Sequence, residues 1–170
     1  FDAKKNIFRV DNELINKLGS RYIVTLFEDS KRNLWIASAD KGVNYYNQKT
    51  GAIKLYKAPE SLGNNQISSM IEDDAGNVFV GTLAGGLFKL NFATQKFDPV
   101  PYNKGDVYLP SKCLYIDKNK RLLIGTDGRG VKVYSKTTQK IEDFEVQSAI
   151  FDFSSRKVHS VLLDKAGNLW

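Results

Sequence analysis

The sequence predicts an all-β protein made of β-propeller blades, each a four-stranded antiparallel sheet, with a repeat of about 44 residues. Three observations predict this fold. A short phrase recurs around Asp29, Asp73, Asp117 and Asp164, at spacings of 44, 44 and 47 residues. A glycine follows each of the first three aspartates by thirteen residues, and a threonine by twenty-one. Short β-branched and aromatic runs, separated by clusters of Asp, Asn and Gly, lie between these markers.

The central repeat shows how one blade is built. The apolar run ISSMIE ends at the turn-forming cluster DDAGN, and VFVGT, rich in β-branched and aromatic residues, follows it. The segment LFKLN then alternates as a strand should, and a fourth short run comes after another turn. We therefore expect strands at 67–72, 78–82, 87–91 and 96–100. The main rival is a β-solenoid, but its rungs are shorter and its strands are parallel.

The same pattern divides the whole chain. We expect residues 1–22 to hold the last strand of a preceding blade (Lys5 to Val10) and a connection. The repeats are then 23–66, 67–110 and 111–157, and 158–170 begins a truncated fourth repeat. Because known closed propellers use about 4 to 8 blades, these three whole repeats predict an incomplete propeller fragment.

Two sets of equivalent positions predict how the blades pack. The eighth and ninth positions after the aspartate are small, at Ala37-Ser38, Gly81-Thr82 and Gly125-Thr126. Small side chains let neighbouring sheets approach closely near the centre of a propeller. A large apolar residue recurs two positions earlier, at Trp35, Phe79, Leu123 and Trp170. We expect these four side chains to form the core between blades rather than a platform for stacking sugars.

Charge and composition narrow the classes of partner. The formal net charge is +6 and the pI is about 9.3, a balance that permits nucleic acid, anionic glycans or membrane surfaces. The lysines, however, are scattered through the turns of every repeat and form no long run. We therefore expect a solvated basic surface and no nucleic-acid contact. No apolar run approaches the roughly 20 residues that span a membrane.

Few residues have the character of catalysts or metal ligands. The single cysteine, Cys113, permits neither a disulfide within the chain nor a cysteine metal site. The only histidine, His159, lies in an apolar run, and we expect it to be packed or at a strand edge. The turns after Asp29 and Asp73 lack the alternating oxygen ligands and closing glutamate of a calcium loop, so these aspartates should cap turns. We expect no catalytic residue, no metal and no cofactor.

Three phrases carry a resemblance to a known family. They are NLWIAS with Lys41-Gly42-Val43, NVFVGT with Gly85-Gly86-Leu87, and LLIGT with Arg129-Gly130-Val131. In register at this spacing, they resemble the two-component regulator propeller repeat over residues 23–144, and in part over 158–170. Ala37 stands where the family usually has glycine, and Phe79 and Leu123 stand where it has tryptophan. These changes are conservative for packing.

The resemblance implies a function. Such repeats form the extracytoplasmic sensor half of large membrane-spanning regulators, in which a histidine kinase and, in hybrid versions, receiver and DNA-binding domains lie elsewhere on the chain. The resemblance therefore implies that this chain is a non-catalytic periplasmic segment. It would sense a carbohydrate-derived signal and regulate transcription through phosphorelay domains outside these residues. Two alternatives are a propeller enzyme of the polysaccharide lyase or glycosidase type and a protein-interaction scaffold.

Propeller geometry indicates where a ligand would bind. The turns between second and third strands share a face with the connections between blades, so we expect a ligand-binding surface there. The candidate residues on this face, for an oligosaccharide or another small polar ligand, are Asp40, Lys41, Asn64, Asn65, Tyr102, Tyr108, Asp127 and Arg129. The other expected partners are further blades of the same protein, or a second copy that completes a ring of seven blades as a homodimer.

Overall fold

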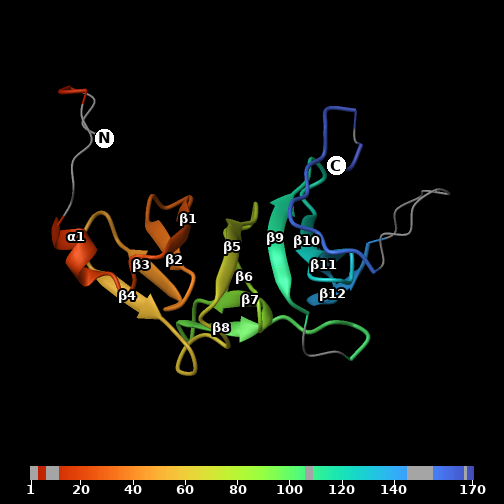
Figure 1. The fold of residues 1–170 in the computed structure, drawn as a ribbon, viewed down its shortest axis with the longest axis horizontal. Coiled ribbons are helices and arrows are strands. Elements are labelled where there is room, and N and C mark those ends of the chain that lie inside the picture. Colours follow the sequence, from red (N-terminus) through yellow and green to blue (C-terminus); the bar gives the residue numbers. More distant parts are fainter. Residues whose placement is uncertain (1–3, 7–11, 106–108, 145–154, 167) are drawn as a thin grey trace.

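The computed structural model of this chain describes residues 4–6, 12–105, 109–144, 155–166 and 168–170. Three four-stranded antiparallel sheets, which we call blades 1 to 3, follow a short helix, α1, at Asn12–Lys17 (Figure 1). Blade 1 consists of β1 (Ile23–Glu28), β2 (Leu34–Ser38), β3 (Val43–Tyr46) and β4 (Ile53–Tyr56). Blade 2 consists of β5 (Ile67–Glu72), β6 (Val78–Thr82), β7 (Gly86–Asn91) and β8 (Lys96–Pro99). Blade 3 consists of β9 (Ser111–Ile116), β10 (Leu122–Thr126), β11 (Val131–Ser135) and β12 (Lys140–Asp143).

The strand order identifies the architecture. In each sheet the strands pair in sequence order and antiparallel, which excludes the parallel rungs of a solenoid. The first strands of the three blades, β1, β5 and β9, are neighbours in space, and the later strands lie progressively farther out (Figure 1). This is the radial arrangement of a β-propeller, and the three blades do not close a ring. The predicted fold class and the four predicted strands of the central repeat are confirmed, with ends that differ by one residue.

The recurring aspartate closes the turn between the first two strands of each blade. Asp29 Oδ1 accepts hydrogen bonds from the backbone N–H groups of Lys31 (3.0 Å) and Asn33 (2.8 Å), and Asp29 Oδ2 accepts one from Trp35 Nε1 (3.0 Å). Asp73 and Asp117 accept the same two backbone bonds in blades 2 and 3. Carboxylates at this position supply the acceptors that the turn backbone lacks. The predicted turn-capping role is confirmed.

A second recurring device holds the turn between the second and third strands. The hydroxyl of Thr82 accepts a hydrogen bond from the N–H of Gly85 (2.9 Å) and donates one to the carbonyl of Gly86 (3.0 Å). Ser38 and Thr126 make the same pair of bonds in their blades. All three hydroxyl side chains are buried. The sequence indicated a small residue at this position, but its hydrogen-bonding role is the stronger requirement.

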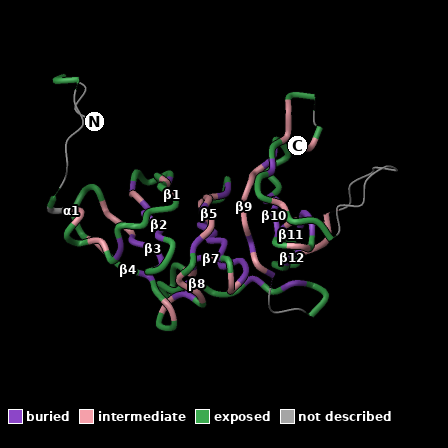
Figure 2. The backbone as a smooth tube through the Cα atoms, viewed as in Figure 1, coloured by how far each residue is buried: buried purple, intermediate pink, exposed green. Residues whose placement is uncertain are grey.

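The core lies between blades rather than inside any one of them. Each blade has a forward face, toward the next blade, and a rear face, toward the preceding one. The forward face of blade 1 presents Phe27, Trp35, Ala37, Val43, Tyr45 and Tyr56 to Met70, Val78, Val80, Phe88, Leu90 and Phe97 of blade 2. The forward face of blade 2 presents Ile71, Phe79, Leu87 and Val100 to Leu114, Leu122, Ile124, Tyr134 and Ile141 of blade 3. Figure 2 shows the buried residues concentrated in the strands of the three blades.

The small residues predicted to allow close approach do so. A Cβ added to Gly81 would lie 3.1 Å from the Cβ of Ser111 in blade 3. A Cβ on Gly125 would lie 2.8 Å from a side-chain carbon of Val158 and 2.4 Å from Cys113 Sγ. Since carbon atoms do not approach so closely without displacement, the glycines set the spacing between neighbouring sheets.

The two ends differ from the prediction. The connection expected before residue 23 contains helix α1, and most of the strand predicted at Lys5 to Val10 lies outside the described residues. The run from Val158 to Asp164 contains one isolated bridge, from Leu163 to Leu169, instead of a regular strand. Trp170, predicted as core between blades, is 74% exposed, because no later blade among the described residues covers it. Trp35, Phe79 and Leu123 are buried as predicted.

Candidate functional site on the loop face

The turn between second and third strands is tied to a connection on each side. The N–H groups of Ala39, Leu83 and Asp127 donate to the carbonyls of Tyr22, Gln66 and Pro110, which end the incoming connections. The N–H of Gly42 donates to Asn65 O (3.1 Å) and that of Gly130 to Arg156 O (2.9 Å), in the outgoing connections. These bonds place turns and connections on one face, as propeller geometry predicts. We call this surface the loop face.

A cavity of about 440 Å³ opens on the loop face of blade 1. It is lined by Ile15, Asn16, Leu18, Gly19, Ser20, Arg21, Tyr22 and Asp40. Asp40, one of the predicted residues, is exposed, and the side chain of Tyr22 is 74% exposed. The hydrogen bond from Ala39 N–H to Tyr22 O (2.9 Å) fixes the backbone that carries both side chains. An exposed aromatic ring, a guanidinium, a carboxylate and an amide therefore surround one hollow.

The predicted asparagines are half-buried and partly committed to the loop itself. Asn65 Oδ1 accepts a hydrogen bond from Ala58 N–H (2.7 Å), and Asn64 Oδ1 accepts one from Gln66 N–H (2.9 Å). Lys41 is exposed, and its turn is held against Asn65 by the Gly42 N–H bond. The structure thus places the turn of Lys41 against Asn65, whereas Asn64 lies against Gly85 in the turn of blade 2.

Asp127 and Arg129 lie on the same face but in blade 3, with blade 2 between them and Asp40. Asp127 is within 3.5 Å of Lys112 Nζ and 3.4 Å of Lys157 Nζ. Partial burial favours the neutral form of Asp127, but the hydrogen bond from Lys157 and the charge of Lys112 outweigh it and lower the pKa of this carboxyl. The predicted residues therefore form two separate groups rather than one constellation.

The two predicted tyrosines do not join either group. Tyr102 is 8% exposed, packs in the core between blades 2 and 3, and donates its hydroxyl hydrogen to Asp143 Oδ1 (2.6 Å). Its connection runs beside the outer strand β12, where Tyr102 bridges Ile141. The ring is consequently unavailable for stacking against a ligand. Tyr108 lies outside the described residues.

Other chemistry has little support in the described part of the chain. Among these residues there is no cluster of three or more His, Cys, Asp or Glu side chains that could hold a metal ion. His159 is exposed rather than packed. No helix of the described residues is long and apolar enough to cross a bilayer.

Sequence analysis missed Arg21 and Tyr22. They end the connection that enters blade 1, in the same place as Gln66 in blade 2. The signal that could have found them is the aromatic residue of KLGSRYI, which stands where the next repeat has the glutamine of SLGNNQI. Tyr22 therefore departs from the residue type found at this position in the next repeat, and the packing of the blade does not require a large ring there.

The fold and the loop face together define a segment of a β-propeller, with the turns between second and third strands and the connections on one face. Residues 17–40 and 61–84 match the family model described as two component regulator propeller. The resemblance seen in the sequence is therefore confirmed at two repeats, 44 residues apart. No curated protein matches the chain.

Solved structures share the fold. The extracellular domain described as part of a hybrid two component system, BT4673 of B. thetaiotaomicron, superimposes with a TM-score of 0.69 at 24% identity, over 86% of this chain and 19% of that one. A second such domain, BT3049 of the same organism, gives 0.62 at 22% identity, over 87% and 20%. Virginiamycin B lyase from Staphylococcus aureus gives 0.65 at 13% identity, over 90% and 50%. The chain thus spans about a fifth of the length of the two extracellular domains. The TM-scores establish that the three structures share the fold of this chain.

Proposed function

We propose that this chain is a ligand-sensing segment of the extracytoplasmic part of a two-component regulator and that it detects a carbohydrate-derived signal. The observation that carries the proposal is the coincidence of two-component regulator propeller repeats with the polar and aromatic cavity on the loop face of blade 1. The ring of Tyr22 offers an apolar surface to the carbon–hydrogen face of a sugar. Arg21, Asp40 and Asn16 offer donors and acceptors to its hydroxyl groups.

In this proposal the chain carries out no chemistry itself. Ligand binding biases the packing between blades or between protein copies, and that bias reaches a kinase and phosphorelay domains outside these residues. A periplasmic location follows from the same proposal. A lyase activity has weaker support, because the likeness to virginiamycin B lyase is one of fold and no acid–base pair converges on the loop face cavity.

Binding of an oligosaccharide on blade 1 is tested by calorimetry of the 170-residue chain against a panel of neutral and acidic oligosaccharides. We expect saturable binding of at least one of them, and a loss of about tenfold or more in affinity in Tyr22→Ala and Asp40→Asn, because each change removes a contact in the cavity. Unchanged melting temperatures would show that the variants fold.

The matched control is Asp127→Asn, which alters the loop face of blade 3 instead. Binding that survives in Tyr22→Ala and Asp40→Asn but disappears in Asp127→Asn would move the site to blade 3 and contradict the blade 1 assignment. No binding across the panel by the folded chain would remove the carbohydrate proposal.

We also propose that the rear face of blade 1 receives another blade, and that in the isolated chain a second copy supplies it. On this face Leu26 is 63% exposed and Leu55 37% exposed, whereas Met70 and Leu114, which occupy the place of Leu26 in blades 2 and 3, pack in the core between blades. These features favour a covered surface.

Sedimentation velocity over a range of concentrations checks this pairing. We expect reversible dimers of the chain, and monomers at the same concentrations in Leu26→Glu, because a carboxylate on this face would be desolvated by the partner. Leu83→Glu is the matched control, since Leu83 is 44% exposed but lies on the loop face. A chain that stays monomeric at all concentrations would remove the homodimer.

A further inference from the structure

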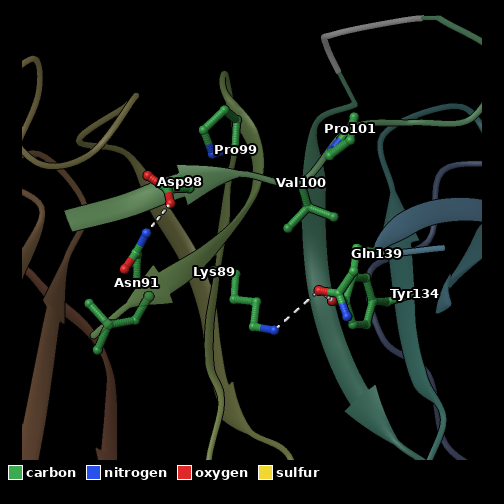
Figure 3. A pocket seen from close by; sticks show the side chains of 9 residues that line it. Lys89, Asn91, Asp98, Pro99, Val100, Pro101, Tyr134 and Gln139 are labelled. Carbon is green, nitrogen blue, oxygen red and sulfur yellow. Dashed lines mark hydrogen bonds between the residues drawn. The ribbon is translucent and has the colours of Figure 1, made fainter. Parts of the chain in front are cut away.

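A cavity of about 390 Å³ lies between blades 2 and 3 (Figure 3). Its lining is Lys89, Leu90 and Asn91 of β7, Asp98 and Pro99 of β8, Val100 and Pro101 after it, and Tyr134 and Gln139 of blade 3. This volume is at the lower end of the range for small-molecule sites, which suits a ligand smaller than a typical drug.

The cavity exists because two positions of the repeat are smaller here than between blades 1 and 2. At the equivalent interface the rings of Tyr45 and Tyr56 lie 4.7 Å and 5.8 Å from the ring of Trp35 and fill the space. Counted from the repeat aspartates, Lys89 replaces Tyr45 and Val100 replaces Tyr56. Two aromatic rings are thus exchanged for a lysine and a valine, and a hollow remains between the sheets.

The oxygens of the two amide groups in the cavity already accept two hydrogen bonds each. Gln139 Oε1 accepts hydrogen bonds from Tyr134 OH (2.6 Å) and Lys89 Nζ (3.3 Å), and Gln139 Nε2 donates to Lys136 O. Burial raises the pKa of Tyr134, so its hydroxyl remains protonated and donates. Asn91 Oδ1 accepts two backbone N–H groups, and its Nδ2 donates to Asp98 Oδ2 (2.8 Å). Each amide therefore keeps a single N–H donor, which offers little to a ligand rich in hydroxyl groups.

The two charged groups are the ones with capacity to spare. Lys89 and Asp98 are directly opposite in the β7–β8 register and so share a face of the sheet. They form no ion pair within 4.0 Å with each other or with any other of the described residues. Lys89 turns toward Gln139, and Asp98 turns toward Asn91 (Figure 3). The ammonium also lies over the rings of Phe79 (5.8 Å) and Tyr134 (5.9 Å), but it donates only one of its three hydrogen bonds, and the carboxylate keeps one unused oxygen. Val100 supplies an apolar wall of the cavity.

We propose that this cavity binds a small zwitterion, an α-amino acid with an apolar side chain. The ligand carboxylate accepts charge-assisted hydrogen bonds from Lys89, and the ligand ammonium donates to Asp98. The apolar side chain of the ligand lies against Val100 and the ring of Tyr134, where Tyr56 and Tyr45 fill the equivalent space of the neighbouring interface. This cavity shares no lining residue with the cavity of blade 1, so the inference does not depend on the function proposed above.

Two other states of the cavity compete with this one. A neutral sugar needs several free donors and acceptors, but both amide oxygens are engaged within the protein and each amide nitrogen keeps only one N–H. A direct Lys89–Asp98 ion pair would need both side chains to leave their present partners, and an ion pair open to solvent is worth little in stability. A zwitterion satisfies both charges without disturbing either hydrogen bond.

The test uses nuclear magnetic resonance of the folded 170-residue chain, with L-leucine as the probe. We expect saturable shifts of the backbone amides of Lys89, Val100 and Gln139, with no shifts around Tyr22 and Asp40 on the loop face. Isocaproate, which lacks the ammonium, and isoamylamine, which lacks the carboxylate, should each bind about tenfold or more weakly, because each removes one charge-assisted contact.

Three variants locate the site. Lys89→Met and Asp98→Asn should each weaken L-leucine binding about tenfold or more, and Val100→Tyr should abolish it by restoring the ring found in the neighbouring interface. Lys96→Met, on β8 but outside the lining, is the matched control and should bind normally. Because Val100→Tyr removes no charge, it still tests the site if Lys89→Met or Asp98→Asn perturbs folding.

Several outcomes would overturn the proposal. One is the absence of saturable shifts with L-leucine on the folded chain. Another is equal binding of L-leucine and both analogues, which would show an apolar hollow without zwitterion recognition. A third is binding of glucose at these residues in preference to L-leucine. Because the reporting amides differ from those of the loop face, failure here and failure of carbohydrate binding on blade 1 are distinguishable.

Discussion

Gly42→Ala should lower the free energy of unfolding by about 4 kcal/mol, the sum of backbone strain and overpacking. Gly42 has a φ of 83°, a conformation that non-glycine residues adopt at a cost. An added Cβ would also lie 2.2 Å from the carbonyl oxygen of Tyr56 and 3.2 Å from Lys57 Cα. Both atoms belong to the backbone, so no side-chain rotation relieves the clash, and β4 and the connection after it must move.

Gly51→Ala is the matched control in the same blade. Gly51 has a φ of 71°, but no atom lies within 4 Å of an added Cβ. It should therefore lose only the conformational part, about 1–2 kcal/mol. Urea denaturation of the two variants and the parent chain measures both losses. Equal losses in the two variants would show that backbone strain alone accounts for the loss of stability in Gly42→Ala. The close approach to Tyr56 would then be unimportant.

The blades were predictable because the signals that form them are local. Each strand is a short run of β-branched or aromatic residues, and each first turn is closed by an aspartate that bonds groups two and four residues ahead, as Asp29 does with Lys31 and Asn33. Repetition then fixed the radial stacking, since Trp35, Phe79 and Leu123 occupy the same place in successive sheets.

The candidate site was less predictable because it depends on how connections cross between blades. Tyr102 and Asp40 both lie in segments predicted to reach the loop face, but Tyr102 is carried inward by its contact with Asp143 of the next blade, 41 residues away. The bond involves a partner that no local pattern indicates. The exposure of Tyr22 likewise depends on what covers the entry to blade 1.

The cavity between blades 2 and 3 was visible in principle. Comparing the repeats position by position shows lysine and valine at Lys89 and Val100 where blade 1 has two tyrosines. Positions that are alike in all repeats predict the fold, whereas positions at which one repeat has smaller or different residues predict the cavity. The volume itself still required coordinates, because Tyr134 and Gln139 come from a different blade.

Asp29→Ala should lower the free energy of unfolding by about 3–5 kcal/mol, because it leaves several buried donors without an acceptor. Asp29 is 7% exposed and accepts two backbone N–H bonds, the side-chain amide of Asn33 and the indole N–H of Trp35. Trp35 is itself 2% exposed and contacts the rings of Tyr45, Tyr56 and Phe97. The donors of Asn33 and Trp35 are buried, so water does not readily replace the carboxylate there and much of the desolvation cost remains.

Asp164→Ala is a matched control within the same chain. Asp164 accepts hydrogen bonds from Asn168 N–H (2.8 Å), Asn168 Nδ2 (2.9 Å) and Trp170 Nε1 (3.0 Å), so it repeats the motif. The side-chain bond from Asn168, followed by that from Trp170, lowers the pKa of Asp164 to about 2. Trp170 is 74% exposed, however, so water replaces the lost acceptor and the loss of stability should be a small fraction of that in Asp29→Ala.

The two tryptophans of the chain make this comparison direct, since each indole N–H bonds to one of the two aspartates. Urea denaturation gives the two losses of stability, and the two indole N–H resonances report which bond is broken in each variant. Asp29→Ala should also move the emission of Trp35 to longer wavelength, because solvent enters the space that the carboxylate filled.

If both variants lost the same stability, hydrogen bonding within the turn would determine the cost and burial between blades would not. A large loss confined to Asp29→Ala would instead show that the neighbouring blade makes the recurring aspartate indispensable, because it excludes the water that could take its place.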